Sequence, residues 1–356
     1  MTKQYGISGA EGYPAGHGRR MPFEPRLILD LDSRSMMCEI DRMDRELGGF
    51  LLSAEDYREL VEDAYASNIH WSTKIEGNRL TFEEVRGLTG LYSSGTLRGP
   101  RYGPEKEILN HLHQMFSDRL PLPWTVGTVM RVHSILLEGV GDQEPGMIGT
   151  EDVSGRLESL VEWVNSSPYP AVITSTLFLH EFENIHPFDN GNGRTGMALF
   201  RMLLQEYGLP NCHLCRFGER LLSDGGMHHD LPEFTDSTEF YTELVSRVIC
   251  SMHEAYVEAM DLFGSRDRLG HYDGDLRPLA RGARSKKMFT LSEACGWSDA
   301  GEQTIRSRLN VLVDDGVLRK EGKTRAMRYV FNDPFDGLRT VIDGVQALRW
   351  TDPDPV

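Results

Sequence analysis

The sequence predicts a mainly α-helical fold followed by a smaller α+β unit. Apolar residues recur at helical spacings through most of residues 28–265, and strand-like alternation is scarce there. After residue 284 the pattern changes to two helical segments and two strand-like segments. The charge changes at the same place, because eleven Lys and Arg stand against six Asp and Glu between Arg281 and Arg328, whereas the whole chain has a net charge of −16. A basic segment on an acidic body indicates a separate partner.

Residues 53–77 carry the clearest helical pattern of the N-terminal half. Ser53 is a favoured N-cap residue, and the apolar residues after it are spaced by three and four. Gly77 is expected to end this helix. Thr81 and Glu84 have the spacing of a capping box, so the next helix should begin after Thr81.

Six more helices are expected before residue 265, and EPGMIGTEDV between two of them predicts a short β-hairpin or an irregular flap. The chain is therefore divided by composition and pattern. The expected parts are a flexible N-terminus at 1–27, an N-terminal helical region at 28–110, a helical core at 111–265, a linker at 266–284, a C-terminal unit at 285–335 and a tail at 336–356.

The C-terminal unit has the pattern of a winged helix-turn-helix. FTLSEACGWS predicts a short helix and turn, GEQTIRSRLNVLVDDGVL a second helix, and LRKEGKTRAMRYVF two strands around a Lys/Gly turn. Basic side chains on the second helix and the wing make DNA one possible partner, with a protein-docking role as the alternative. The candidate DNA-binding residues are Arg306, Arg308, Lys320, Lys323 and Arg325.

The segment IHPFDNGNGRTGMALF, residues 185–200, combines a base, a glycine turn and a cation. Gly191, Asn192 and Gly193 let backbone N–H groups point into one concavity, and the helix that follows adds its N-terminal N–H groups. Such a nest binds phosphate, and Arg194 can grip the same group. His186 precedes the nest and suits a general base at neutral pH.

HPFDNGNGR resembles the signature of the Fic (Fido) family, H-P-F-x-[DE]-G-N-G-R-x-x-R, and the similarity extends from about residue 22 to 260. The resemblance implies an all-helical core with a short hairpin flap that docks the target segment as an added strand. It also implies transfer of AMP from ATP to a Ser, Thr or Tyr hydroxyl of a target protein, with Mg²⁺ as cofactor.

Carried over residue by residue, the resemblance makes His186 the catalytic base and Phe188 a buried anchor. Phe240 and Tyr241 match an aromatic pair that lies against the adenosine. The implied nucleotide-binding residues are Asn190, Gly191, Asn192, Gly193, Arg194, Thr195, Gly196, Met197, Phe240 and Tyr241.

The same family has an inhibitory motif, [ST]-x-x-x-E-[GN], which Ser72, Glu76 and Gly77 match on the predicted helix at about 53–77. A carboxylate at the C-terminal end of a helix is disfavoured by the dipole, so Glu76 is expected to have a cationic partner. The inhibition could act within one chain or between the subunits of a homodimer.

Two positions depart from the signature. Asn190 stands where the family has a carboxylate, and its neutral oxygen is a weak ligand for Mg²⁺. Met197 replaces the second arginine, which in relatives binds the γ-phosphate and pairs with the inhibitory glutamate. Arg201, one turn further on, is the nearest candidate for the pairing with Glu76. The alternative is that Arg201 is a surface or structural ion-pair residue and that Glu76 pairs with Arg194, Lys74 or nothing.

These departures leave two other functions open. The chain could be a weak or inactive Fic protein that acts as a nucleotide-responsive DNA-binding regulator, or a transferase that uses another phosphate-containing donor. A zinc peptidase is disfavoured, because His180 and His186 are six residues apart rather than four. Five cysteines, no signal-peptide core and no membrane-length apolar run predict a cytoplasmic protein without a membrane partner, in which Cys212 and Cys215 are structural.

Overall fold

The computed structural model describes residues 23–99, 101–117, 120–140, 146–223, 236–268, 272, 274, 276–323 and 327–332. It is mainly helical, which confirms the predicted fold class. The larger, N-terminal part contains the helices α1 (Leu31–Leu47), α2 (Ala54–Lys74), α3 (Phe82–Ser93), α4 (Gly103–Ser117), α5 (Val126–Leu137), α6 (Glu151–Asn165), α7 (Ala171–Ile185), α8 (Asn192–Glu206), η1 (Cys212–Leu214), α9 (Phe217–Leu222) and α10 (Ser237–Gly264).

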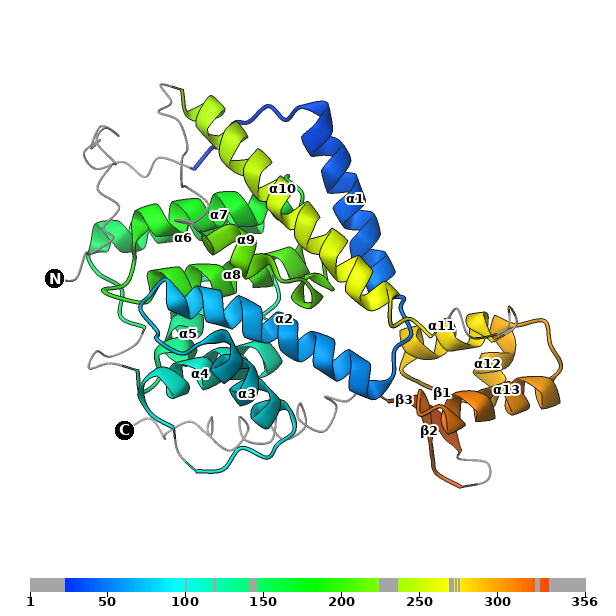
Figure 1. Ribbon diagram of the computed structural model, residues 1–356. Helices are drawn as coiled ribbons and strands as arrows, with labels where there is room; N and C mark the ends of the chain where they lie inside the picture. Colours follow the sequence, from blue (N-terminus) through cyan, green and yellow to red (C-terminus); the bar gives the residue numbers. More distant parts are fainter. Residues whose placement is uncertain are drawn as a thin grey trace, which may run out of the picture.

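Helices α7 and α8 form the centre of this part. Both are buried along most of their length; α7 is mostly apolar, whereas α8 buries two arginines, Arg194 and Arg201, beside its apolar residues. One core cluster lies between them and α5 and α6, and a second joins them to α1, α2 and α10. Figure 1 shows the long α10 running beside α1, with α2 crossing the body below them. The short segment between α7 and α8 therefore has a rigid support on both sides.

Helix α2 follows the sequence prediction at both ends. The Ser53 side chain accepts a hydrogen bond from the Asp56 N–H at its start, and the last helical residue is Lys74. The backbone of residues 75–77 then forms tight turns. Gly77 has a φ of 95°, a conformation that favours glycine. Thr81 forms the predicted capping box at the start of α3. As a result, Glu76 lies just beyond the end of α2.

The predicted flap is only partly described, since residues 141–145 lie outside the described residues. Residues 146–150 contain no strand. They are held against the segment that follows α7, because the Gly149 N–H donates to the Pro187 carbonyl oxygen at 3.1 Å.

The C-terminal unit contains α11 (Arg277–Lys286), β1 (Met288–Phe289), α12 (Leu291–Ala294), η4 (Cys295–Trp297), α13 (Glu302–Asp314), β2 (Leu318–Glu321) and β3 (Arg328–Phe331). The strands form an antiparallel sheet in the order β1-β3-β2. The helix α13 and the two strands β2 and β3 were predicted, whereas β1 was not. A two-residue strand is too short to leave a pattern in the sequence.

Part of the predicted linker is helical. Residues 277–284 belong to α11, whose buried face consists of Leu279, Ala280 and Ala283. This face is small and interrupted by Gly282, so its helical pattern is weak. Gly282 is needed because a Cβ there would overlap the ring of Trp297. The stretch is therefore part of the C-terminal core and not a connection.

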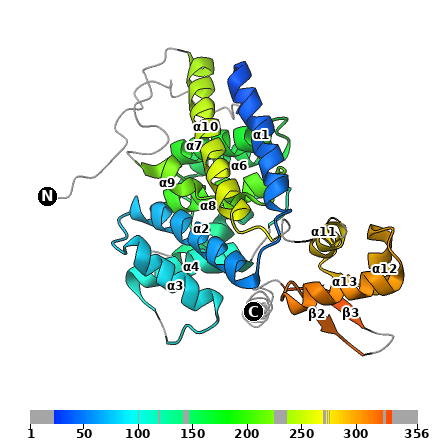
Figure 2. The same cartoon turned by 45° about the vertical axis from the view of Figure 1, so that its right-hand side comes forward.

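The C-terminal unit is joined to the larger part where α1 leads into α2. Leu51 is 1% exposed and belongs to the C-terminal core cluster. Its N–H donates to Asp267 Oδ1 at 2.8 Å, and its carbonyl oxygen accepts from the Arg268 N–H at 2.7 Å. The Arg284 guanidinium donates to the Phe50 carbonyl oxygen. Figures 1 and 2 show the unit beside the N-terminal end of α2, the end opposite Glu76.

Within the described part of the chain, the helices are too short or too polar to cross a membrane.

Candidate active site

The segment between α7 and α8 is a turn fixed by its own side chains. His186 ends α7 with a φ of 51°, and Gly191 precedes α8 with a φ of 73°. Phe188 is buried between them. The Asn192 side chain closes the turn, because its Oδ1 accepts from the Phe188 N–H at 3.0 Å and its Nδ2 donates to the Phe188 carbonyl oxygen at 2.6 Å. The Asn192 amide thus shapes the turn, although the resemblance implied that it holds phosphate.

His186 is exposed and lies where α7 ends and this turn begins. Its own N–H still bonds to the Phe182 carbonyl oxygen at 3.0 Å, so the backbone is anchored while it leaves the helix. A left-handed conformation in a residue with a Cβ costs roughly 1–2 kcal/mol. The neighbouring bonds of Asn192 hold this conformation in place. The imidazole is therefore presented to solvent from a rigid backbone, as a general base requires.

The N-terminus of α8 forms an anion-binding nest, and a carboxylate of the same chain already lies in it. Glu76 Oε1 accepts from the Gly193 N–H at 3.1 Å. A Cβ at Gly193 would lie 2.5 Å from this oxygen, and one at Gly191 would lie 2.9 Å from Leu137 Cδ2. Glycine at 193 therefore leaves room for the close approach of the carboxylate, and the φ of 73° at Gly191 favours glycine there.

Arg194 lies at the centre of the charged groups of the site and is 7% exposed. It forms a buried ion pair with Glu107 of α4. Its Nη2 donates to Asn190 Oδ1 at 2.9 Å and is 3.7 Å from Glu76 Oε2. Asn78 donates to the other oxygen of Glu107 at 2.6 Å. Glu107 thus neutralises the arginine that faces the nest, and the paired, hydrogen-bonded geometry is what a buried charge needs.

Glu107 and Asn78 were not predicted as site residues. The available signal was a carboxylate within the apolar helix pattern of KEILNHLHQMF. A buried acidic residue usually has a cationic partner. The sequence alone does not identify that partner, which lies 87 positions away.

Phe240 and Tyr241 begin α10 and pack on α7. Their ring centroids are 5.0 Å and 5.8 Å from that of His180. Phe23 lies edge-on to Tyr241 at 6.2 Å. The predicted aromatic pair is therefore supported by the helix that leads to His186. Ser72 and Thr195 are both buried side chains, and the latter follows Arg194 in the first turn of α8.

Comparisons with known proteins bear on the same segment. Residues 123–204, which run from before α5 into α8, match the model of the Fic/DOC family. The chain contains a Fic domain. Over 206 residues it is 24% identical to the protein adenylyltransferase Fic of Drosophila willistoni, and equally to that of Drosophila persimilis. These matches cover 52% of this chain and only 40% of the relatives' length.

A Fic family protein from Desulfovibrio desulfuricans G20 has a similar structure. The TM-score is 0.56 at 19% sequence identity, and the match covers 87% of this chain and 98% of that one. At this identity the likeness concerns the fold. It extends beyond the residues that match the family model.

Within the Fic domain, the prediction that Arg201 replaces the missing second arginine is wrong. Arg201 is 6% exposed and donates to Gln114 Oε1 at 2.7 Å and to Gln205 Oε1 at 3.1 Å. Gln114 lies seven residues after Glu107, just as Arg201 lies seven after Arg194. Side chains of α4 therefore reach the face of α8 that carries both arginines, and Gln114 holds the second one in the core.

Glu76 instead contacts Arg194 and the Gly193 N–H, one of the alternatives left open by the sequence. Met197, where relatives have the second arginine, is buried in the core shared with α2 and α10. Among the residues that the structure describes, Arg194 provides the guanidinium at the nest, and this guanidinium also binds Glu107.

The implied Mg²⁺ can be tested against Asn190. A guanidinium has only donors, so the amide oxygen of Asn190 must be the atom that faces Arg194. A divalent cation on that oxygen would lie against a positive charge. Among the described residues, no group of three or more His, Cys, Asp and Glu could hold a metal. The side chains present fit a Mg²⁺ site at Asn190 poorly.

Glu183 on α7 is a further carboxyl group near the nest, besides Glu76 and Glu107. A Cβ at Gly196 would lie 3.0 Å from its Oε1. Burial, reinforced by the negative charge of Glu76, raises the pKa of Glu183 to about 7. The site therefore contains a carboxyl group that changes charge near neutral pH, coupled to the glutamate that fills the nest.

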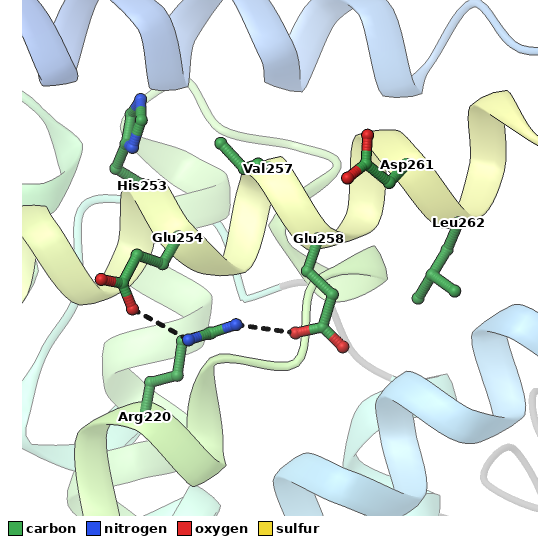
Figure 3. Close-up of a pocket in the computed structure, with 7 residues that line it drawn as sticks. All are labelled: Arg220, His253, Glu254, Val257, Glu258, Asp261 and Leu262. Atoms are coloured by element: carbon green, nitrogen blue, oxygen red, sulfur yellow. Dashed lines mark hydrogen bonds and ion pairs between the residues drawn. The ribbon is translucent and has the colours of Figure 1, made fainter.

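A groove of about 610 Å³ shares no residue with this site. Figure 3 shows Arg220 of α9 between Glu254 and Glu258 of α10, with bonds of 2.8 Å and 3.0 Å. The remaining residues that line the groove are His253, Val257, Asp261 and Leu262. The arginine bridge ties α9 to α10 and needs no ligand to explain it.

Two other sequence predictions concern residues outside the nest. Cys212 and Cys215 are buried free thiols whose pKa is raised by burial, which suits a structural role. In the C-terminal unit Arg306 is exposed and ion-paired with Glu302 at 3.0 Å. Of the other candidates there, Lys320 and Lys323 are exposed, Arg308 is half-buried, and Arg325 lies outside the described residues.

Proposed function

We propose that the Fic domain transfers AMP from ATP to a hydroxyl group of a protein side chain. The observation that carries this proposal is the nest at the start of α8, where the Gly193 N–H and Arg194 both face one anionic group. The carboxylate of Glu76 stands in the position that a phosphate of the donor would take. The relatives named protein adenylyltransferase Fic support the same reaction.

His186, Arg194 and the N–H groups of the nest would carry out this reaction. The hydroxyl oxygen forms a bond to the α-phosphorus of ATP, the bond between the α- and β-phosphates breaks, and pyrophosphate leaves. His186 accepts the hydroxyl proton as the new bond forms. The N–H groups of the nest and Arg194 stabilise the charge that develops on the phosphate oxygens. No step is assigned to Mg²⁺, because Asn190 Oδ1 faces Arg194.

The experiment is labelling with ATP that carries its label in either the α- or the γ-phosphate. AMP transfer retains only the α-label on protein. A γ-label on protein would mean phosphoryl transfer, and no label from ATP but label from another phosphate-containing donor would support the alternative donor. Absence of nucleotide binding as well as of labelling would refute the proposal.

Glu76 is proposed to inhibit this reaction by occupying the nest of its own chain. Since α2 and α8 belong to the same molecule, no second subunit is needed for the contact. Dilution should then leave the inhibited state unchanged, whereas inhibition between the subunits of a dimer would weaken on dilution.

A second function, DNA binding, is proposed for the C-terminal unit. Its element order and the sheet order β1-β3-β2 fit a winged helix-turn-helix. Helix α13 buries Ile305, Leu309 and Leu312 and leaves Arg306 exposed on another face. Phosphate contacts by such a face and by Lys320 should make the affinity for DNA fall with salt. If no duplex is shifted in a gel at low salt, the unit is a protein-docking module.

A further inference from the structure

His133 of α5 joins three parts of the Fic domain that no sequence motif connects. Its side chain is buried, with 5% exposed. Its Nε2 lies 3.0 Å from the Asn190 carbonyl oxygen, and its Nδ1 accepts from the Gly146 N–H at 2.8 Å. The ring stacks on Phe188, with centroids 3.7 Å apart and planes inclined by 18°.

The two partners fix the tautomer of His133. An amide N–H can only donate, so Nδ1 must carry a lone pair, and a carbonyl oxygen can only accept, so Nε2 must carry the hydrogen. Both contacts therefore exist together only in the neutral form with the proton on Nε2. Burial and the nearby charge of Arg194 lower the pKa of His133, which favours this form.

The segment that begins at Gly146 is tied to the turn after α7 at two points. Besides the bond from Gly146 to His133, the Gly149 N–H donates to the Pro187 carbonyl oxygen at 3.1 Å. Gly146 has a φ of 90°, and a Cβ there would overlap Ser134. Between the two ties, Met147 is 65% exposed. The segment thus presents an apolar side chain to solvent from a backbone fixed relative to the His186 turn.

We propose that His133 is a positioning residue that holds residues 146–149 against the His186 turn and so sets where the acceptor hydroxyl approaches the base. The proposal rests on the proposed function for its second half only. The holding contact exists whatever reaction the site performs. His133 touches no reacting atom and acts through the Gly146 N–H, the Asn190 carbonyl oxygen and the Phe188 ring.

Two amide variants separate the two contacts of the ring. In His133→Asn the amide oxygen can occupy the place of Nδ1 and accept from Gly146, but the side chain is too short to reach Asn190. In His133→Gln the amide nitrogen can occupy the place of Nε2 and donate to Asn190, but the acceptor for Gly146 is lost. His111→Gln is the matched control, since His111 of α4 is another buried histidine whose ring bonds to a backbone group, the Glu107 carbonyl oxygen, and not to residues 146–149.

The measurements are hydrogen exchange of residues 146–149 and self-labelling with ATP. Loss of a buried hydrogen bond increases the population of the open segment roughly tenfold to hundredfold. His133→Gln should therefore speed the hydrogen exchange by about that factor. It should lower the labelling rate at saturating ATP by roughly tenfold or more while changing the KM for ATP less than about threefold. His133→Asn should restore both readouts to within about threefold of wild type, and His111→Gln should leave the exchange unchanged.

Unchanged exchange in His133→Gln would overturn the proposal. Faster exchange with an unchanged labelling rate would also overturn it, because residues 146–149 would then not position the acceptor. If wild type binds ATP but labels nothing, the proposed function fails, and the exchange of the two variants still decides whether His133 holds the segment. Thermal unfolding of each variant checks that the exchange reports the segment and not global unfolding.

Discussion

Removal of Glu76 from the nest tests the site most directly. Glu76→Gly deletes the carboxylate that accepts from the Gly193 N–H and lies near Arg194. Glu76→Gln keeps an oxygen that can accept the same bond but removes the charge. The two variants therefore separate simple occupation of the nest from electrostatic neutralisation.

The size of the effect follows from the contacts that are lost. A charge-assisted hydrogen bond contributes roughly 1.5–3 kcal/mol. The contact with Arg194 adds little, because it is 3.7 Å long, the Glu76 side chain is 26% exposed, and the guanidinium already binds Glu107. Ordering of the Glu76 side chain offsets part of this gain. A net of about 1–2 kcal/mol remains, so Glu76→Gly should tighten ATP binding roughly 5- to 30-fold and Glu76→Gln by less.

The assay compares wild type, Glu76→Gly, Met197→Arg and the double mutant for ATP binding and self-labelling. An arginine at 197 lies one turn beyond Gly193, and helical side chains lean toward the N-terminus. It should strengthen inhibition while Glu76 is present and strengthen ATP binding once Glu76 is removed. Lys74→Ala is the control, since Lys74 is close to Glu76 in sequence but lies over the Trp71 ring.

Two results would refute this reasoning. Activation by Glu76→Gly of far more than about 100-fold would mean that Glu76 inhibits fully without a second arginine. If Met197→Arg changes neither readout, the nest does not bind a triphosphate in the way proposed, and AMP transfer from ATP falls with it.

Four further outcomes are expected. His186→Ala should lower labelling by about 10²–10⁴-fold without changing the unfolding temperature, and activity within about tenfold of wild type by mass spectrometry would exclude His186 as the base. Removing Mg²⁺ with EDTA should change the ATP affinity of wild type less than about threefold but that of Asn190→Asp by more. An equal loss of affinity in both proteins would contradict the inference that Asn190 faces Arg194 and does not bind Mg²⁺. Because the folded pKa of Glu183 is raised from 4.5 to about 7, its protonated form stabilises the fold fully below the unfolded pKa and less as pH rises toward 7. Urea unfolding should therefore show that the free energy of unfolding of wild type falls by about 1 kcal/mol between about pH 6 and pH 8. Glu183→Gln should not show this fall once the titrations common to both proteins are subtracted. Leu51→Ala should cost about 2–5 kcal/mol, because it empties a buried position of the C-terminal core, and a change below about 1 kcal/mol would mean that the unit is not fastened there.

The sequence by itself determined the features that depend on short stretches of chain. The helical periodicity predicted the mainly α fold, and Ser53, Gly77 and the Thr81 capping box predicted the limits of α2 and the start of α3. The glycine turn ahead of α8 predicted an anion-binding nest, because positive φ and free N–H groups are local properties. Helix α11 was missed because its buried face is too small to leave a clear periodic pattern in the sequence.

Only the tertiary structure decided which groups meet at the nest. Glu76 reaches Gly193 across 117 positions, Glu107 reaches Arg194 across 87, and His133 reaches Asn190 across 57. The sequence indicated that Glu76 needs a partner but left Arg201 and Arg194 both open, because the two arginines share one face of α8. Helix α4 supplies Glu107 to the first arginine and Gln114 to the second. Spacing along one helix fixes which side chains share a face, whereas the packing of a second helix fixes which of them remains available to the site.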